Sequence, residues 1–212
     1  MSSSLGSIFR IHTFGESHGP AVGVVIDGCP PRLPITSEEI QSDLNRRRPG
    51  QSSLVTQRDE KDAVEVLSGW KNGLTLGTPL ALLVRNQDHI SGAYDHLKDV
   101  YRPSHADFTT DQKYGIRAHE GGGRSSARET IGRVAAGAVA RKLLSISAGV
   151  QVLAWVHQIH NISGSYEINN VTLDDVESSP TRCPDPGAAT KMTKAIEKAR
   201  KDGDSLGGIV QC

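Results

Sequence analysis

The chain has little of what marks a secreted or membrane protein. Its only cysteines, Cys29, Cys183 and Cys212, lie far apart among 212 residues. They fit neither a disulfide framework nor a zinc pattern, which favours a reducing compartment. No apolar run approaches the ~20 residues of a membrane span, and residues 1–6 (MSSSLG) lack the apolar stretch of a signal peptide. We therefore expect a cytoplasmic protein without a membrane partner.

An excess of either charge is also absent. The chain carries 24 Lys and Arg residues against 24 Asp and Glu residues, and its pI is about 7.1. Binding to nucleic acid depends on basic groups that displace counterions from phosphates, and no basic excess exists here. The balance therefore predicts no nucleic-acid partner.

The sequence does contain well-delimited secondary-structure signals. Residues 21–27 (AVGVVID) and 79–86 (PLALLVRN) are apolar segments that end at turn residues, so they predict strands. Thr36 and Glu39 form a capping box, which predicts a helix that ends near Arg48. The other expected elements are a partly alternating segment at 62–70, a helix over 126–144 with a capping box at Ser126 and Glu129, a strand over 151–159, a helix over 190–200 and a strand from 207.

Three further segments predict features of the fold beyond single helices and strands. Residues 87–110 show no periodicity, and so long a loop in a compact domain is usually functional or disordered; its aromatic residues favour order. Small residues at 135–138 (AAGA) predict that the helix over 126–144 packs closely in the core. The chain stops within the apolar segment 207–212 (GGIVQC), so we expect part of the native core to be supplied by sequence that is absent here.

Residues 121–126 (GGGRSS) lead into the helix over 126–144. Backbone N–H groups at a helix N-terminus, with Arg124, Arg128 and serine hydroxyls, can hold a phosphate or another anion. A guanidinium about 4 Å from an anion supplies ~4 kcal/mol at an effective dielectric of ~20, before desolvation. A plain glycine-rich turn that only starts a helix would show the same pattern, and the motif alone does not separate the two.

Two histidines occur in loop settings, His18 in residues 15–19 (GESHG) and His105 in residues 102–107 (RPSHAD). Imidazole titrates near neutral pH, so both are candidates for proton transfer. The alternative for each is a surface histidine hydrogen-bonded to a neighbour, with Asp107 orienting His105 or capping a turn. The form Gly-x-Ser-x-Gly at 15–19 does not predict a serine hydrolase, because it precedes a strand instead of following one.

Two further clusters favour simpler interpretations. Arg46, Arg47 and Arg48 fall in the last turn of a predicted helix, where cations are favoured, so a solvated face explains them when they are taken alone. His157 and His160 lie three residues apart, but no third ligand has suitable spacing. We therefore predict no metal site.

Taken together, these segments resemble the chorismate synthase family in their order and spacing, and the likeness covers essentially the whole chain. The segments that carry it are 14–19 (FGESHG), 45–50 (NRRRPG), 102–107 (RPSHAD), 123–130 (GRSSARET) and 201–208 (KDGDSLGG).

The resemblance implies a lyase of the shikimate pathway. Chorismate synthases eliminate phosphate from 5-enolpyruvylshikimate 3-phosphate to give chorismate, the last common step of aromatic amino-acid biosynthesis. These flavoproteins require reduced FMN although no net oxidation occurs, and NADPH serves only members that also reduce their flavin. The resemblance further implies an α+β fold, a β-α-β sandwich with helices packed between antiparallel sheets. It implies a homotetramer, and a single domain over 1–212 that is truncated at its C-terminus.

The resemblance also implies roles for individual residues. His18 matches the acid that protonates the departing phosphate, Ser17 a serine beside it, and His105 the group that protonates or stabilises reduced flavin. Cofactor contacts are implied for Arg124, Ser125 and Ser126 with FMN, and for Arg47 with a nicotinamide nucleotide. Contacts with the anionic substrate are implied for Arg46, Arg48 and Arg128, because guanidinium groups bind carboxylates and phosphates through forked hydrogen bonds.

The chain also departs from the family. Ser53 stands where many bacterial relatives have arginine, which weakens a nucleotide contact there. The family's later half, with glycine-rich flavin contacts and a catalytic aspartate, is absent. A non-catalytic anion- or flavin-binding fragment or interaction protein is therefore the alternative function. A phosphotransferase that uses residues 121–126 is a weaker third hypothesis, because acidic metal ligands are not evident.

Overall fold

The computed structural model describes residues 3–52, 54, 61–87, 94 and 96–212, and Ser53 and residues 88–93 of the predicted loop lie outside this description. The backbone separates into two compact units. Unit 1 consists of Met1–Gly50 and Arg58–Gly149, and unit 2 of Gln51–Gln57 and Val150–Cys212. The prediction of a single domain over residues 1–212 stays a prediction.

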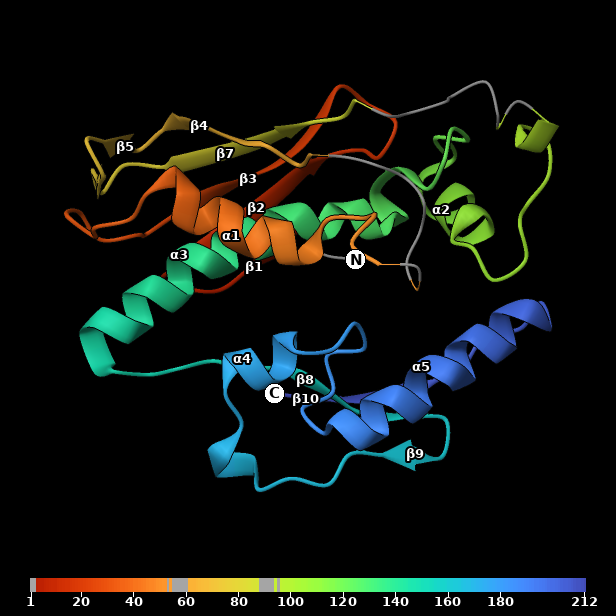
Figure 1. Ribbon diagram of the computed structural model, residues 1–212. Helices are drawn as coiled ribbons and strands as arrows, with labels where there is room; N and C mark the ends of the chain where they lie inside the picture. Colours follow the sequence, from red (N-terminus) through yellow and green to blue (C-terminus); the bar gives the residue numbers. More distant parts are fainter. Residues whose placement is uncertain (1–2, 53, 55–60, 88–93, 95) are drawn as a thin grey trace. The chain divides into compact units, whose positions relative to one another are not determined.

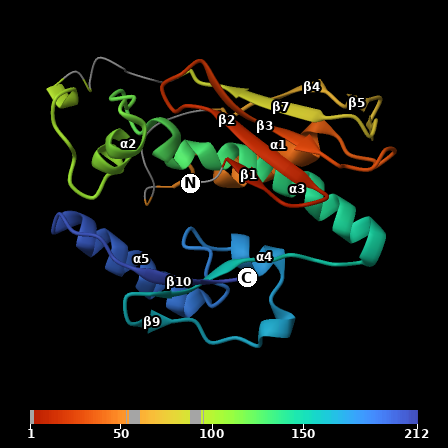
Figure 2. The same cartoon turned by 180° about the vertical axis from the view of Figure 1, so that it is seen from behind.

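Unit 1 contains a five-stranded antiparallel sheet with strand order β1-β2-β3-β7-β4. Helices α1 and α3 pack against each other and against one face of this sheet (Figures 1 and 2). The elements of the unit are β1 (Ser4–Leu5), β2 (Arg10–Gly15), β3 (Ala21–Asp27), α1 (Ser37–Arg47), β4 (Val64–Ser68), β5 (Trp70–Lys71), β6 (Leu74–Thr75), β7 (Leu80–Arg85), α2 (Asp107–Tyr114), η2 (Gly123–Ser125), η3 (Ala127–Glu129) and α3 (Thr130–Ala148).

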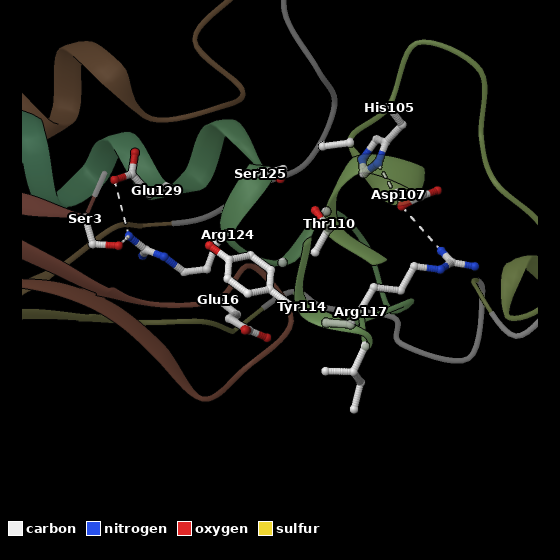
Figure 3. A pocket seen from close by; sticks show the side chains of 15 residues that line it. Ser3, Glu16, His105, Asp107, Thr110, Tyr114, Arg117, Arg124, Ser125 and Glu129 are labelled. Carbon is white, nitrogen blue, oxygen red and sulfur yellow. Dashed lines mark hydrogen bonds and ion pairs between the residues drawn. The ribbon is translucent and has the colours of Figure 1, made fainter. Parts of the chain in front are cut away.

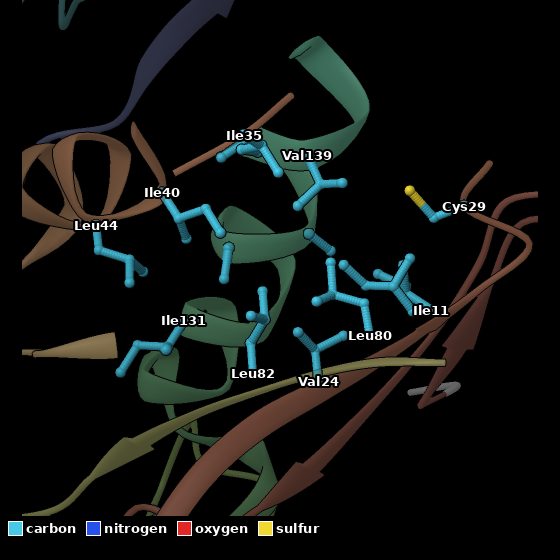
Figure 4. Close-up of a cluster of buried hydrophobic side chains, with 14 of the residues drawn as sticks. Ile11, Val24, Cys29, Ile35, Ile40, Leu44, Leu80, Leu82, Ile131 and Val139 are labelled. Carbon is cyan, nitrogen blue, oxygen red and sulfur yellow. The ribbon is translucent and has the colours of Figure 1, made fainter. Parts of the chain in front are cut away.

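The core of unit 1 lies between the sheet and the two helices, where buried aliphatic side chains meet (Figure 4). Strand β3 supplies Val24 and Ile26, helix α1 supplies Leu44, and helix α3 supplies Val139, all of which are fully buried. Alternate residues of β2 and β7 point into the same core. Burial of such side chains contributes about 1.5–3 kcal/mol each and holds the helices on the sheet.

Helix α3 approaches the sheet closely at a glycine. A Cβ atom at Gly132 would lie 2.8 Å from the carbonyl oxygen of Gly23 and 3.0 Å from Cγ2 of Thr13. Ala135, Ala136 and Ala138 are also buried. The prediction that small residues let this helix pack in the core is therefore confirmed.

Unit 2 contains a three-stranded antiparallel sheet with strand order β10-β8-β9. Its small core consists of Cys183, Ala188, Ala189 and Met192 with partly buried residues of β8 and β9. The elements of the unit are β8 (Trp155–Ile159), β9 (Ile162–Ser163), η4 (Ile168–Asn170), α4 (Leu173–Glu177), α5 (Pro186–Lys201) and β10 (Gly208–Gln211).

The predicted α+β class, with helices packed on antiparallel sheets, is confirmed. Strand β3 has the predicted bounds, and Thr36 caps α1 in a complete capping box with Glu39. The capping box predicted at Ser126 is wrong: this side chain accepts from the backbone N–H of Arg128, in a short η3 turn that precedes α3. In the described part of the chain, no helix has both the length and the apolar character needed to cross a bilayer.

Candidate active site

His18 lies in the loop between β2 and β3, against the glycine turn (residues 121–123). A Cβ atom at Gly121, which has a φ of +63°, would overlap the imidazole ring of His18. The hydroxyl of Ser17 lies 3.1 Å from Nδ1 of His18, and the backbone N–H of Ser17 donates to the carbonyl of Gly123. Ser17 is buried. The turn therefore needs glycine both for its backbone conformation and to leave room for the ring.

His105 is held by a carboxylate from the start of α2. Nδ1 of His105 lies 2.9 Å from Oδ1 of Asp107. The guanidinium of Arg102 donates hydrogen bonds to both carboxylate oxygens of Asp107, each over 2.8 Å, and Arg117 lies 3.3 Å from the same carboxylate. These hydrogen bonds from Arg102 hold the pKa of Asp107 well below its usual range, although burial opposes the shift. Asp107 therefore stays ionised and can orient the imidazole ring.

A continuous series of contacts connects the two histidines. Nη2 of Arg102, which binds Asp107, also donates to the carbonyl of Gly121 over 2.7 Å. His105 thus contacts Asp107, Asp107 contacts Arg102, Arg102 contacts Gly121, and Gly121 lies against His18. The two histidines singled out in the sequence are thus linked to the same glycine turn, His18 directly and His105 through Asp107 and Arg102, although 87 positions separate them.

A pocket of about 550 Å³ opens beside this turn (Figure 3), within the range of small-molecule sites. Its lining comes from the N-terminal segment, the loop after β2, helix α2 with the residues on both sides of it, and the glycine turn with η2 and η3. The residues that line it are Ser3, Glu16, His105, Ala106, Asp107, Thr110, Tyr114, Ile116, Arg117, Ala118, Gly122, Gly123, Arg124, Ser125 and Glu129.

Arg124 lines the pocket, but its hydrogen bonds also hold the end of β2. Its guanidinium donates to the carbonyl of Gly15 at 2.9 Å and to Oγ1 of Thr13 at 2.7 Å, and lies 3.4 Å from Glu129. Burial alone would raise the pKa of Glu129, but hydrogen bonds from Thr13 and Arg133 outweigh it and the pKa is lowered. Glu129 is therefore ionised, and its charge is offset by Arg124 and Arg133.

The two predicted serines differ in position. Ser125 lines the pocket, in η2. Ser126 caps η3 through the backbone N–H of Arg128 over 3.3 Å. The capping box predicted for Ser126 fails because Glu129 turns to Oγ1 of Thr13 instead, at 2.7 Å, and this bond ties α3 to the sheet.

The predicted substrate arginines do not gather at this pocket in the described part of the chain. Arg128 and Arg47 both bind Asp62, at 2.9 and 3.0 Å, and the side chain of Asp62 is fully buried. Arg46 lies 3.9 Å from Asp43. Arg48 ends α1, and its backbone N–H donates to the carbonyl of Leu44.

Sequence reasoning missed several residues that shape the site. Asp62 has a φ of +47° and forms ion pairs with two arginines, and no local pattern marks it. Asn86 follows β7 and donates to two carbonyls of the His18 loop. Its one signal is its place as a polar residue at the end of an apolar strand. Arg117 reaches Asp107 from beyond α2, which only the tertiary fold reveals.

His157 and His160, which lie three residues apart in the sequence, are in different environments in the structure. Nδ1 of His157 lies 2.8 Å from the hydroxyl of Tyr166. His160 is exposed in the turn between β8 and β9, with a φ of +55°. Among the residues that the structure describes, no three His, Cys, Asp or Glu side chains are grouped so that they could hold a metal ion.

Comparison with known proteins agrees with the motifs. The sequence model of the chorismate synthase family matches residues 9–212. The chain is 59% identical to the chorismate synthase of Akkermansia muciniphila over 213 residues and 58% identical to that of Synechococcus elongatus over 212 residues. Each match covers 100% of this chain but only 59% of the relative, so the chain spans about three-fifths of their length.

A solved structure supports the same likeness. The structure titled "Crystal Structure of Chorismate Synthase" superposes on this chain with a TM-score of 0.71 at 31% sequence identity. The match covers 96% of this chain and 57% of that chain.

Proposed function

The chain belongs to the chorismate synthase family, and from this premise we propose that it converts 5-enolpyruvylshikimate 3-phosphate into chorismate at a site that bears two histidines. The reaction is a 1,4-elimination that releases phosphate in the shikimate pathway. One observation carries the proposal: two side chains that can carry a proton are linked to one glycine turn. His18 contacts the turn directly, and His105 is linked to it through hydrogen bonds of Asp107 and Arg102. A reaction that expels phosphate needs a proton or positive charge at the departing oxygen.

His18 is the proposed acid for the departing phosphate. Its ring lies against Gly121, and the hydroxyl of Ser17 is within hydrogen-bond distance of Nδ1. A proton donor works best when its ring is held in one orientation, and the buried Ser17 supplies that restraint. His105 is the proposed group that protonates or stabilises the cofactor, and ionised Asp107 fixes its ring from the Nδ1 side.

The pocket beside the turn fits part of a flavin site. Its volume of about 550 Å³ is large enough for the flavin ring system. His105, Arg117, Arg124 and Ser125 supply hydrogen-bond donors in its wall. Asp107 and Glu129, two of its three acidic residues, are paired with arginines, so these two do not exclude an anion; the third is Glu16. Reduced FMN, when bound, supplies an electron-rich ring beside the substrate without net oxidation. Ser126 joins the proposed FMN contacts on the family resemblance; it follows Ser125 of the pocket wall and is the N-cap residue of η3.

Arg46, Arg48 and Arg128 are the proposed contacts for the substrate anion, and Arg47 the contact for NADPH in a protein that also reduces its flavin. Arg47 and Arg128 already share the buried Asp62. An anionic ligand that recruits either arginine therefore competes with that carboxylate. We extend the proposal to a cytoplasmic homotetramer, which rests on family membership alone.

The test is an anaerobic chorismate assay of the 212-residue chain with 5-enolpyruvylshikimate 3-phosphate and reduced FMN. His18→Ala and His105→Ala should each lower turnover by at least ~10²-fold, as expected for acid–base groups. His12→Ala is the matched control, because His12 is an exposed histidine of the same unit on β2. Near-normal turnover in both pocket variants would overturn the assignment.

A binding measurement separates the alternative function. The chain spans 59% of its relatives' length. The alternative function is a fragment that binds flavin or substrate without turnover. Quenching of FMN fluorescence by the wild-type chain, with no chorismate formed, would support this alternative. Chorismate formation by the wild-type chain would exclude it.

A further inference from the structure

Asn86 occupies a buried position between the His18 loop (residues 16–20) and the start of α3. It is the residue directly after β7, and its exposed fraction is 8%. Its backbone N–H donates to the carbonyl of Pro20 over 3.1 Å, which extends the pairing of β3 with β7 by one bond. The side chain therefore starts from a fixed point at the end of a central strand.

The side-chain amide of Asn86 binds the carbonyls on both sides of His18. Nδ2 donates to the carbonyl of Glu16 over 2.8 Å and to the carbonyl of Gly19 over 2.6 Å. The same loop also closes on itself, because the backbone N–H of Gly19 donates to the carbonyl of Glu16. One amide group thus fixes the loop on both sides of the imidazole-bearing residue.

The amide can take only one orientation. Its Oδ1 accepts a hydrogen bond from Nε of Arg128. A flipped amide would set Oδ1 against two carbonyl oxygens and the NH₂ group against a guanidinium, and every contact would be repulsive. Arg128 in turn donates from Nη1 to Asp62 over 2.9 Å, and both of these side chains are nearly or fully buried. The orientation of Asn86 is therefore imposed by the buried Arg128–Asp62 pair.

We propose that Asn86 is a positioning residue for His18: it transmits the fixed geometry of the buried Arg128–Asp62 pair to the loop that carries the proposed acid. The inference rests on the proposed function for its catalytic meaning, but its structural claim concerns only the place of one imidazole ring. A buried network of hydrogen bonds between charged and polar groups restricts the movement of the groups that it joins, and small displacements of a reacting group lower the rate steeply.

The test is Asn86→Asp in the 212-residue chain. Aspartate keeps the shape and the acceptor for Arg128, but it replaces the donor Nδ2 with an oxygen that faces the carbonyls of Glu16 and Gly19. The loop should therefore open, and the ring of His18 should leave the edge of the Tyr94 ring, where the centroids are 5.0 Å apart. Asn72→Asp is the matched control, because it adds the same charge at an exposed turn of the same unit.

The readout is the NMR signal of the His18 Cε1–H group, assigned by its absence in His18→Gln. An aromatic ring shifts the resonance of a proton held beside it, so the signal should move in Asn86→Asp while that of His105 and all signals in Asn72→Asp stay in place. A merely structural role for Asn86 would lower the melting temperature and leave the His18 signal of the folded state unchanged, and that result would overturn the proposal. Asn86→Ser, which removes the bridging amide without adding charge, replaces the variant if Asn86→Asp does not fold.

Turnover gives an independent second readout. In an active protein, Asn86→Asp should lower kcat by about 10²-fold with KM nearly unchanged. If the wild-type chain forms no chorismate, the proposed function fails while the NMR comparison still decides the role of Asn86. An unmoved His18 signal in an active chain instead overturns the positioning role alone.

Discussion

The imidazole ring of His18 occupies the space that a side chain at Gly121 would need. This relationship joins two segments that are 103 positions apart in the sequence. Glycine is therefore required at position 121 for two reasons: the turn needs its backbone conformation, and the ring of His18 needs the space.

Gly121→Ala should therefore cost more than backbone strain. Alanine at a positive φ costs roughly 1–2 kcal/mol, and the collision with His18 should add about 1–3 kcal/mol. Gly115→Ala is the matched control, since Gly115 has a φ of +70° and no atom within 4 Å of an added Cβ. Urea unfolding of both variants gives the difference, and equal losses of unfolding free energy would contradict the overlap.

Asp107→Asn should lose stability in a pH-dependent way. Hydrogen bonds from Arg102 hold the pKa of Asp107 below its ordinary value, so the folded chain binds fewer protons there than the unfolded chain. The stabilisation is fully present above the ordinary pKa of ~4 and is lost as the pH falls through the lower folded-state pKa. At pH 7 the variant should lose about 3 kcal/mol, and this gap should shrink steadily below pH ~4.

The control for Asp107 is Asp27→Asn. Asp27 pairs with Arg10 at 2.9 Å, but both side chains are about half exposed. Such a pair contributes about 0–1 kcal/mol. Unfolding free energies measured between pH 2 and pH 7 should therefore show the narrowing gap only for Asp107. A gap that stays constant with pH would contradict the shifted pKa.

Asp62→Asn should destabilise unit 1 strongly. The carboxylate of Asp62 is fully buried and binds both Arg47 and Arg128. Removal of its charge leaves two guanidinium groups facing a neutral amide, which should cost about 3–5 kcal/mol. Glu65→Gln makes the same chemical change in an exposed pair with Arg85 and should cost less than ~1 kcal/mol. Thermal unfolding of the two variants makes the comparison, and equal effects would contradict a buried ion cluster.

Two glycines of α3 should respond to alanine with opposite signs. Gly137 has no atom within 4 Å of an added Cβ, so Gly137→Ala should raise the unfolding free energy by about 0.5–1 kcal/mol through helix propensity. At Gly132 the added Cβ would meet the carbonyl oxygen of Gly23, a backbone atom in the central strand that cannot move aside cheaply. Gly132→Ala should therefore lower it. Stabilisation by both changes would show that the helix does not approach the sheet so closely.

Local signals in the sequence predicted the elements that depend on local interactions. Residues 21–27 formed the expected strand, and Thr36 began α1 with the expected capping box. Strand β2 went unpredicted because His12 and Thr13 interrupt its apolar residues, and tertiary pairing with β3 decides its conformation. Glu129 misled the helix start, because its long-range bond to Thr13 won over a local cap.

In the candidate site, too, the sequence predicted the features that depend on local segments and not those that depend on tertiary contacts. The sequence identified His18, His105 and the glycine turn, because reactive side chains in turn-forming segments are visible locally. It could not show that Arg102 joins Asp107 to Gly121, because that contact depends on how the chain folds back. It likewise could not show that Arg47 and Arg128 are taken up by Asp62, since the three residues come from three separate segments.

The bridge made by Arg102 has a consequence for how the site could be retuned. His18 leans on Gly121 through its ring, and His105 reaches the same residue through Asp107 and Arg102. The spacing between the two imidazoles therefore depends on this short piece of backbone, which bears no reactive group, as well as on the Asn86 side chain that holds the His18 loop. A slight change in the conformation of that backbone would affect the positions of both rings. The distance between the imidazoles of His18 and His105 could therefore change without replacement of either histidine.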